Sequence, residues 1–232
     1  MDTTMNGVKL LVVDDEPAIR KLLNAGLTTQ GYDVTSAATA AEAIARVGEA
    51  RPDLVILDLG LPDMPGRDLL ARWRAEGLDV PVVILSSRTD EAGIVEALEG
   101  GADDYVTKPF GMNELIARLR VALRHRLQQQ GEKPLFKVGD LSVDLVRRIV
   151  RLKEREVKLS PKEYDILRLL VQHAGRVLTH AFILQKVWGQ AYDVQYLRVY
   201  VRQLRQKLED NPEQPRYIRT ETGVGYRLAE PD

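Results

Sequence analysis

The sequence predicts two domains, an α/β domain with a doubly wound parallel sheet followed by a smaller α+β domain. Between residues 8 and 126, aliphatic runs alternate five times with segments of helical periodicity. Runs such as 54–57 show no polar alternation, which suits strands covered by helices on both faces. From residue 135 onward, short alternating strand patterns precede three helical segments. A chain of 232 residues is long enough for two cores of ordinary size.

The first domain is predicted to occupy residues 1–126. Its five strands are expected at 8–13, 32–35, 54–57, 81–85 and 104–107. Its five helices are expected at about 18–30, 40–50, 66–76, 90–99 and 113–126. The polar segment 127–134, which contains Gly131 and Pro134, interrupts the apolar periodicity and is interpreted as a short linker.

The second domain is predicted to occupy residues 135–232. Alternating patterns indicate a small antiparallel sheet with strands at 136–138, 141–143, 149–152 and 157–159. Helices are expected at about 161–173, 181–187 and 194–209, the first of them introduced by the capping box Ser160-Pro161-Lys162-Glu163. Residues 216–228 fold back at Gly223 and Gly225 as a hairpin, and three helices followed by a hairpin form a winged helix.

Composition and charge narrow the class of protein. The chain has no cysteine, which excludes disulfides, thiol catalysis and cysteine-based zinc sites. No apolar run approaches the roughly 18 residues of a membrane helix, so we expect a cytoplasmic protein without a membrane partner. Residues 1–126 hold 14 Lys/Arg and 20 Asp/Glu, whereas residues 133–232 hold 19 and 13. An acidic half joined to a basic half suggests a regulatory or metal-binding domain linked to a domain that meets a polyanion.

Functional side chains follow the predicted strands of the first domain. Asp14 and Asp15, Asp58, Ser86 and Lys108 each stand at the carboxyl end of a strand, the edge at which open α/β sheets bind ligands. Clustered carboxylates repel unless a cation shares the site, and oxygen ligands suit Mg²⁺. A carboxylate can accept a phosphoryl group where Mg²⁺, an ammonium and a hydroxyl offset its charge. The pattern therefore predicts a phosphoryl-acceptor site.

Four segments, VVDDEP, LDLGLPDMPG, Ser86 after VVIL and GADDYVTKPF, resemble the receiver domain of two-component response regulators over about residues 8–126. The resemblance implies a flavodoxin-like fold and phosphorylation of Asp58 by a sensor histidine kinase. It further implies that Asp14, Asp15, Asp58 and the Gly60 carbonyl hold Mg²⁺, that Lys108 and Ser86 contact the phosphoryl group, and that Tyr105 is a switch residue. In that family the Lys108-Pro109 bond is cis.

The third helix of the second domain has two distinct faces when it is read at about 100° per residue. Leu197, Val201, Leu204 and Leu208 share one stripe. The opposite side carries no acid and presents Gln195, Arg198, Val199, Arg202, Gln203 and Gln206. Arg and Gln can hydrogen-bond base edges, and Val can contact a thymine methyl group, so this face is predicted to read DNA.

The second half resembles the OmpR/PhoB-type effector domain through LSPKEYDILRLL, GRVLTHAFILQKVW, YLRVYVRQLRQKLE and ETGVGYRL. The resemblance makes the third helix the recognition helix and assigns residues 188–193 to the loop that meets RNA polymerase. Many relatives have Arg before the first wing glycine, where this chain has Thr222. Insertion of an arginine into the minor groove is therefore not expected there, and Arg219 or Arg227 is expected to contact phosphate instead.

The resemblance also implies a homodimer of receiver domains that forms on phosphorylation. Its expected interface residues are Ile94, Asp103, Asp104, Glu114, Arg118 and Arg120. Relatives usually carry Lys or Arg where Ile94 stands, paired with an acid that corresponds to Glu114. One intermolecular ion pair of the usual dimer is thus expected to be missing, with an apolar patch around Ile94 in its place.

These observations favour a transcription regulator whose binding to promoter DNA is controlled by phosphorylation of Asp58. Within the family, LDLGLPD, ARLRVALRH and YLRVYVRQLRQKLE most resemble regulators of potassium-transport operons. One alternative is a regulator of the same family that serves another operon, and another is a DNA-binding protein with an unphosphorylated receiver. A third is an aspartate-dependent phosphatase, but such enzymes usually carry a second Asp two residues after the nucleophile, where this chain has Gly60.

Overall fold

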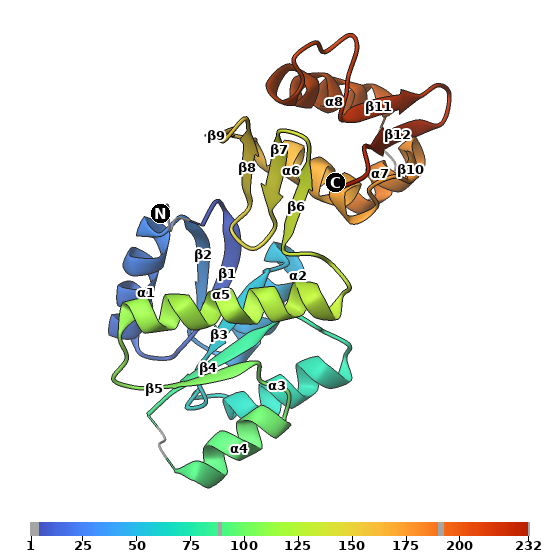
Figure 1. Cartoon of the computed structure of the whole chain (residues 1–232). Coiled ribbons are helices and arrows are strands. Elements are labelled where there is room, and N and C mark those ends of the chain that lie inside the picture. The colour runs from blue at the N-terminus through green and yellow to red at the C-terminus, as the bar shows by residue number, and fades with distance from the viewer. Residues whose placement is uncertain (1–4, 88–89, 190–192, 232) are drawn as a thin grey trace. The chain divides into compact units, whose positions relative to one another are not determined.

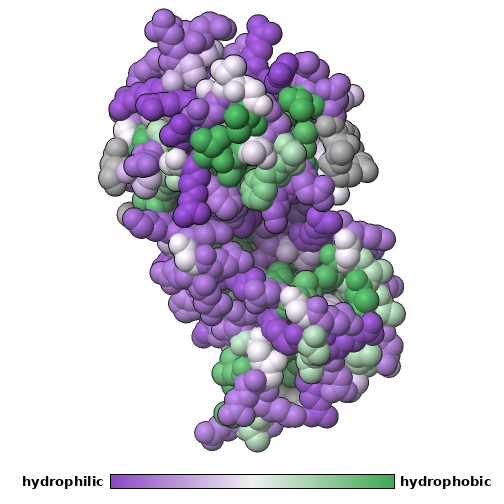
Figure 2. Space-filling model, turned by 90° about the vertical axis from the view of Figure 1, so that its right-hand side faces the viewer, coloured by the Kyte–Doolittle hydropathy of each residue, from purple (hydrophilic) through white to green (hydrophobic). Residues whose placement is uncertain are grey.

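The computed structural model describes residues 5–87, 90–189 and 193–231, which form two compact units, Met1–Gly131 and Glu132–Asp232 (Figure 1). We call them the receiver unit and the effector unit and describe each by itself. Within the described residues, no helix is long and apolar enough to cross a membrane. On the face shown in Figure 2, hydrophilic side chains cover most of the surface and apolar ones form separate small groups.

The receiver unit contains the predicted parallel sheet of five strands, in the order β2-β1-β3-β4-β5. The strands are β1 (Val8–Val13), β2 (Tyr32–Ala37), β3 (Leu54–Leu57), β4 (Val82–Ser86) and β5 (Asp104–Thr107). The helices are α1 (Pro17–Thr29), α2 (Ala40–Ala50), α3 (Gly66–Ala75), α4 (Glu91–Glu99) and α5 (Met112–Gln129). The predicted doubly wound fold is therefore confirmed, and β1 and β3 lie together at its centre.

Both faces of the receiver sheet are covered, as the uninterrupted aliphatic runs predicted. Every residue of β3 is buried, and α2, α3 and α4 contribute Ala43, Leu69 and Ala97 to one core cluster. On the other face, α5 crosses the sheet (Figure 1), and Met112 at its start packs against Gly26 of α1. Helix α5 continues to Gln129, past the predicted start of the linker at residue 127, because Leu127 extends its buried stripe.

Within residues 132–189 and 193–231, the effector unit contains two small sheets and three helices. The first sheet has the order β6-β7-β8-β9 and the second the order β10-β12-β11. The strands are β6 (Leu135–Val138), β7 (Leu141–Asp144), β8 (Ile149–Leu152), β9 (Arg155–Glu156), β10 (Val177–Thr179), β11 (Ile218–Glu221) and β12 (Gly225–Leu228). The helices are α6 (Pro161–Gln172), α7 (His180–Trp188) and α8 (Val194–Leu208). This arrangement is the predicted winged helix, in which β11 and β12 form the wing.

Two strands of the effector unit differ from the prediction. The fourth strand was expected at 157–159, but β9 pairs with β8 directly after a tight turn in which Lys153 and Glu154 both have positive φ. Neither residue is one that usually marks such a turn, so the sequence did not reveal it. Strand β10 was not predicted; it pairs with β12, where Gly225 lies so close to the Leu178 carbonyl that a Cβ would clash.

A buried carboxylate links α6 to α8. Glu163 completes the predicted capping box with Ser160 and also accepts a hydrogen bond from Lys207 at 2.6 Å. Burial alone would raise the pKa of Glu163, but the bonds from Lys207 and Ser160 outweigh it and lower the pKa. Because the folded-state pKa lies below the usual 4.5, the stabilisation is complete above that pH and is lost as the pH falls through the lowered pKa.

We therefore expect Glu163→Gln to destabilise the effector unit at pH 7 by about 1–3 kcal/mol, and the difference from wild type to shrink below pH 4.5. Urea denaturation of the full chain, followed by Trp188 fluorescence in a Trp73→Phe background, measures it. A difference that stays constant down to acid pH would show that the Glu163 charge is irrelevant.

Candidate phosphoacceptor site and nucleic-acid interface

The central strands of the receiver sheet bring two buried carboxylates together. Asp14 follows β1 and is fully buried, and Asp58 follows β3 with 7% of its surface exposed. The two strand ends are joined directly, because the Asp58 amide donates to the Val13 carbonyl at 2.8 Å. The predicted convergence of these strand ends is thus a consequence of β1 and β3 being neighbours in the sheet.

Lys108 lies between the carboxylates and serves as their counter-ion. Its Nζ is 2.8 Å from Asp14 Oδ2, 2.9 Å from Asp58 Oδ2 and 3.1 Å from Glu16 Oε1. Burial would lower the pKa of Lys108, but the hydrogen bonds to Asp14 and Asp58 raise it well above its usual value. The ammonium therefore stays charged at every physiological pH. The Lys108 amide donates to the Ser86 carbonyl at 2.8 Å, and the following bond to Pro109 is cis.

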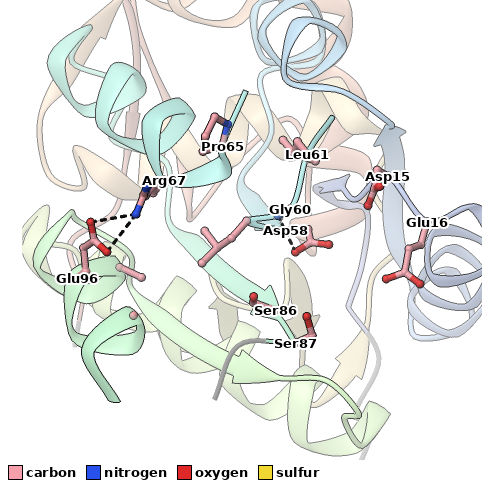
Figure 3. A pocket seen from close by; sticks show the side chains of 13 residues that line it. Asp15, Glu16, Asp58, Gly60, Leu61, Pro65, Arg67, Ser86, Ser87 and Glu96 are labelled. Atoms are coloured by element: carbon pink, nitrogen blue, oxygen red, sulfur yellow. Dashed lines mark hydrogen bonds and ion pairs between the residues drawn. The ribbon is translucent and has the colours of Figure 1, made fainter. Parts of the chain in front are cut away.

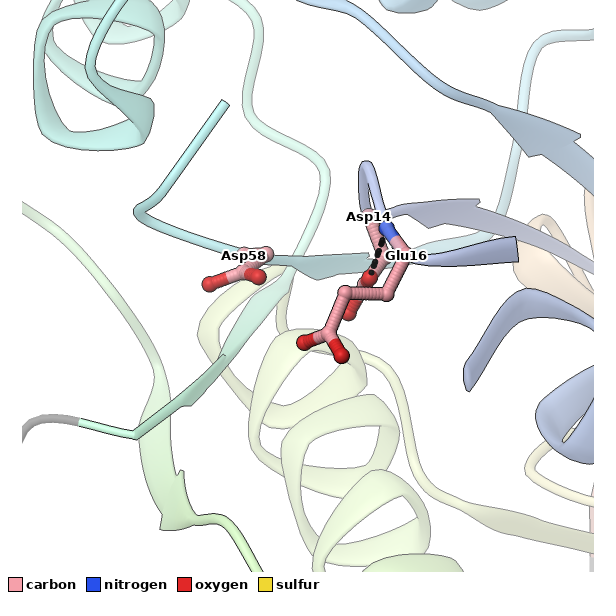
Figure 4. Close-up of side chains that lie close together, drawn as sticks. All are labelled: Asp14, Glu16 and Asp58. Carbon is pink, nitrogen blue, oxygen red and sulfur yellow. Dashed lines mark hydrogen bonds between the residues drawn. The ribbon is translucent and has the colours of Figure 1, made fainter. Parts of the chain in front are cut away.

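The third carboxylate of the cluster is Glu16, which we did not predict, rather than Asp15. Carboxylate oxygens of Asp14, Glu16 and Asp58 all lie within 4.8 Å of one another (Figure 4). Asp14 Oδ1 also accepts the Glu16 amide at 2.9 Å, and this turn brings Glu16 back toward the cluster. Asp15 is exposed and lines the same pocket. Glu16 is exposed as well, and the assignment of Asp15 to the metal stays a prediction.

The donor set fits Mg²⁺. The ion prefers oxygen ligands, and carboxylate oxygens of three acids converge here. Burial raises the pKa of Asp14, against the hydrogen bonds from Lys108 and the Glu16 amide that lower it. A cation bound beside Asp14 would offset this cost of burying its charge.

A pocket of about 510 Å³ opens beside Asp58 (Figure 3). Its lining includes Asp15, Gly60, Ser86 and Ser87, so Ser86, one of the two predicted contacts of the phosphoryl group, faces the same space as Asp58. The Gly60 amide donates to Asp58 Oδ1 at 3.2 Å. The site is therefore accessible on one side and carries cationic, hydroxyl and carboxylate groups around one candidate nucleophile.

The loop after Asp58 is held at two points that sequence reasoning missed. Asp63 accepts the amides of Ala40 and Ala41, both at 2.9 Å, and so caps α2. Gly66 lies against the Asp58 carbonyl, where a Cβ would come within 2.2 Å of the oxygen. These contacts fix the course of the loop that carries Gly60.

The predicted dimer surface is only partly as expected. Ile94 is half-buried and packs against the receiver core, so it is not the centre of an exposed apolar patch. On α4 the exposed apolar side chains are instead Val95, with 44% of its surface exposed, and Leu98, with 42%. These two residues are three positions apart and so lie on the same side of the helix. Val121 of α5 is 40% exposed. Tyr105 of β5, the predicted switch residue, is buried in the core cluster against which Ile94 packs.

The charged residues predicted for the dimer surface are paired within the chain. Asp104 and Glu114 both bind Arg118, at 3.1 and 3.0 Å. The Asp103 side chain accepts the Val82 amide at 2.8 Å and lies 3.4 Å from Arg74, so it supports the receiver fold. Arg120 is half-buried beside Tyr32, where burial raises the tyrosine pKa to about 12 against the opposing effect of Arg120.

Helix α8, the predicted recognition helix, shows the predicted separation of its faces. Its buried residues are Leu197, Val201, Leu204 and Leu208. The predicted DNA face is exposed throughout, at Gln195, Arg198, Val199, Arg202, Gln203 and Gln206. With the acid-free sequence of α8, this gives a continuous surface of cations and amides beside the wing.

The wing arginines are not equivalent. Arg219 is exposed, whereas Arg227 donates to Glu221 on the neighbouring strand at 2.9 Å. Arg205, which we did not predict, joins the wing to α8 by donating to the Ile218 carbonyl at 2.8 Å and to Thr220 Oγ1 at 2.7 Å. Its position at the border of the two α8 faces was the signal available in the sequence.

Comparisons with known proteins find a matching protein family for each of the two units. Residues 10–120 match the response regulator receiver domain, and residues 154–228 match the C-terminal domain of transcriptional regulatory proteins. The chain belongs to the OmpR/PhoB family of two-component response regulators. It is 47% identical over 222 residues to the transcriptional regulatory protein KdpE of Mycobacterium tuberculosis, covering 94% of this chain and 98% of the relative. It is 45% identical over 224 residues to the KDP operon regulator KdpE of Escherichia coli, with the same coverage.

Other relatives show how far the likeness extends. The response regulator MtrA of Mycolicibacterium smegmatis is 38% identical over 233 residues, and the match covers both chains completely. Among solved structures, the receiver domain of a Francisella response regulator matches with a TM-score of 0.50 and 32% identity, over 51% of this chain and 98% of that one. A CheY-like receiver from Methanospirillum hungatei matches with a TM-score of 0.51 and 28% identity, over 53% and 99%. The chain is thus a response regulator with a DNA-binding effector domain.

Proposed function

We propose that this chain is a transcription regulator whose binding to promoter DNA is switched on by phosphorylation of Asp58 by a sensor histidine kinase. The observation that carries the proposal is the position of Lys108 Nζ, 2.8 Å from Asp14 and 2.9 Å from Asp58. A fixed ammonium beside a buried carboxylate offsets the charge that a transferred phosphoryl group brings. Because the proposed partner is promoter DNA, we propose a cytoplasmic location.

In the proposed transfer, Asp58 attacks phosphorus and the bond to the donor breaks, so the leaving group departs with the bonding electrons. Mg²⁺, held by Asp14, Glu16 and Asp58, would supply positive charge for the phosphoryl oxygens. Lys108 keeps contact with one oxygen, and the Ser86 hydroxyl, which faces the same pocket, donates to another. The chain itself contributes position and charge and remains the acceptor, so the step is a modification rather than an enzyme turnover.

The test of phosphorylation is direct. With acetyl phosphate and Mg²⁺, the full chain should gain the mass of one phosphoryl group, and Asp58→Asn should gain none. Glu16→Gln should lower the Mg²⁺ affinity measured by titration, because it removes one carboxylate of the cluster. Equal labelling of wild type and Asp58→Asn would refute Asp58 as the acceptor.

We further propose a potassium-transport operon as the target, since the KdpE relatives reach 47% identity. A regulator of another operon is the alternative, which the 38% identity to MtrA over the whole chain keeps in view. DNA upstream of potassium-pump genes should bind the phosphorylated chain more tightly than Asp58→Asn.

RNA polymerase is a proposed second partner, through residues 188–193. Residues 190–192 lie outside the described structure, and Trp188 beside them packs on Tyr200 at 5.7 Å between ring centroids.

Phosphorylation is proposed to pair two receivers through α4, β5 and α5. Because Val95 and Leu98 are exposed and Ile94 is not, Val95→Asp should leave the monomer folded and weaken the phosphorylated dimer. Ile94→Asp should instead destabilise the receiver. Sedimentation of the phosphorylated proteins measures both, with Leu22→Asp as the matched control, since Leu22 is 53% exposed on α1. Unchanged sedimentation of Val95→Asp would exclude this surface.

A further inference from the structure

Three charged side chains share the outer face of the wing. The register places Arg219 directly opposite Arg227, and Glu221 follows Arg219 by two residues. Because side chains alternate along a strand, all three project from the same face. The other face carries Tyr226, which is buried. The wing strands therefore display two cations and one anion to the solvent, while α8 beside them contains no acid.

Glu221 neutralises one of these cations. Two arginines directly opposite each other repel, and a diagonal neighbour two residues along is within reach of long side chains. Glu221 Oε1 accepts from Arg227 Nε at 2.9 Å and also from its Nη2. Gly225 stands opposite Glu221, so no side chain on the paired strand covers the carboxylate. Arg227 is consequently committed to Glu221, and Arg219 carries the net charge of this face.

We propose that Glu221 is an internal counter-ion that lowers the affinity of a single effector unit for DNA phosphates, and thereby makes DNA binding depend on dimerisation. The inference rests on the proposed DNA-binding function. Sequence-independent affinity comes from cations that displace counterions from the phosphates, so a neutralised arginine removes one such contact. A unit with a weak phosphate contribution needs a second unit on a paired half-site, which phosphorylation would provide.

The position of Glu221 supports an effect on DNA without direct contact. Arg205 of α8 bonds to the Thr220 side chain, so α8 contacts the Thr220 face of the wing, and Glu221, one residue further on, projects from the other face. Charges act over about 8–10 Å at physiological salt. A phosphate drawn toward Arg219 therefore meets the field of Glu221 as well, whatever the base sequence. Glu221 should weaken operator and random DNA by the same factor.

The sign of one substitution separates this inference from its rival. If Glu221 is a counter-ion, Glu221→Gln frees Arg227 and tightens binding; if Glu221 only orients Arg227 for a phosphate contact, the same change weakens binding. One additional phosphate contact adds about 0.9 to the slope of log affinity against log salt, or roughly three- to tenfold in affinity near 0.1 M salt. Arg227→Gln should weaken binding, because it leaves Glu221 uncompensated. The double variant should return to the wild-type affinity.

The experiment measures the affinity of the full chain for a random-sequence duplex and for promoter DNA across a salt series, by fluorescence anisotropy. Glu213→Gln is the matched control, since Glu213 is an exposed acid between α8 and β11. It should change neither affinity nor slope. In the Asp58→Asn background, Glu221→Gln should restore measurable promoter binding without phosphorylation.

The outcomes are distinct. A tighter Glu221→Gln with a steeper salt slope, reversed by adding Arg227→Gln, supports the counter-ion. Unchanged or weaker binding by Glu221→Gln, with normal wild-type binding, overturns it and leaves the proposed function intact. An equal gain in DNA affinity from Glu213→Gln would mean that only the net charge of the chain matters, and it would also overturn the inference. Absence of wild-type binding to any duplex would refute the proposed function together with this inference.

Discussion

Replacing Glu209 with alanine should destabilise the effector unit by about 2–6 kcal/mol, the largest loss we expect from a single polar substitution. Glu209 ends α8 and is 7% exposed. Its carboxylate accepts the backbone amides of Arg216, Tyr217 and Ile218 at 2.7, 2.9 and 2.8 Å. Tyr217 and Ile218 are buried, so alanine would leave two buried donors unsatisfied, each at a cost of roughly 1–3 kcal/mol.

The loss should be localised at the wing. The three amides lead into β11, and Arg205 holds the same segment by its bond to the Ile218 carbonyl. Hydrogen exchange of the full chain should therefore show faster exchange in β11 and β12 than in the receiver sheet. Glu213→Ala, an exposed acid in the same loop, should leave exchange unchanged. Protection of β11 that survives Glu209→Ala would mean that the wing is held by its packing alone.

The receiver site could be predicted from the sequence because its position follows from local patterns and sheet topology. Buried parallel strands are recognisable as aliphatic runs, and their carboxyl ends must share one edge, so Asp14 and Asp58 could be placed together without a structure. The same logic could not reveal that Glu16 also approaches this cluster. Its approach depends on the turn after β1, in which the Glu16 amide bonds back to Asp14.

Features that depend on contacts between distant segments were not predictable. Glu209 looked like the last residue of a helix, and only the fold shows that it receives a strand seven to nine residues later. Ile94 was taken for an exposed position because charged residues stand there in relatives. In this chain the aliphatic side chain of Ile94, at the edge of the buried stripe of α4, packs against the core. Helical periodicity indicates the centre of a buried stripe better than its edges.

The substitution with the largest expected effect on specificity is Arg202→Ala, which should reduce the preference for operator over random DNA by about 1–3 kcal/mol. Arg202 is exposed at the centre of the acid-free face of α8, with Gln206 one turn further on. Both side chains can donate to base edges, and a base contact discriminates between sequences whereas a phosphate contact does not. Gln206→Ala should therefore act in the same direction.

Two further substitutions separate reading from folding and from phosphate binding. Leu204 is fully buried in the opposite stripe, so Leu204→Ala should cost about 2–5 kcal/mol of stability without a change of preference in the folded fraction. Arg219 is exposed on the wing, so Arg219→Ala should weaken operator and random DNA equally and reduce the salt slope by about one. Affinities for both duplexes across a salt series distinguish the three patterns. Should Arg202→Ala and Gln206→Ala fold normally and keep the full preference, the sequence of the operator is not read by this face of α8, since the opposite face is buried.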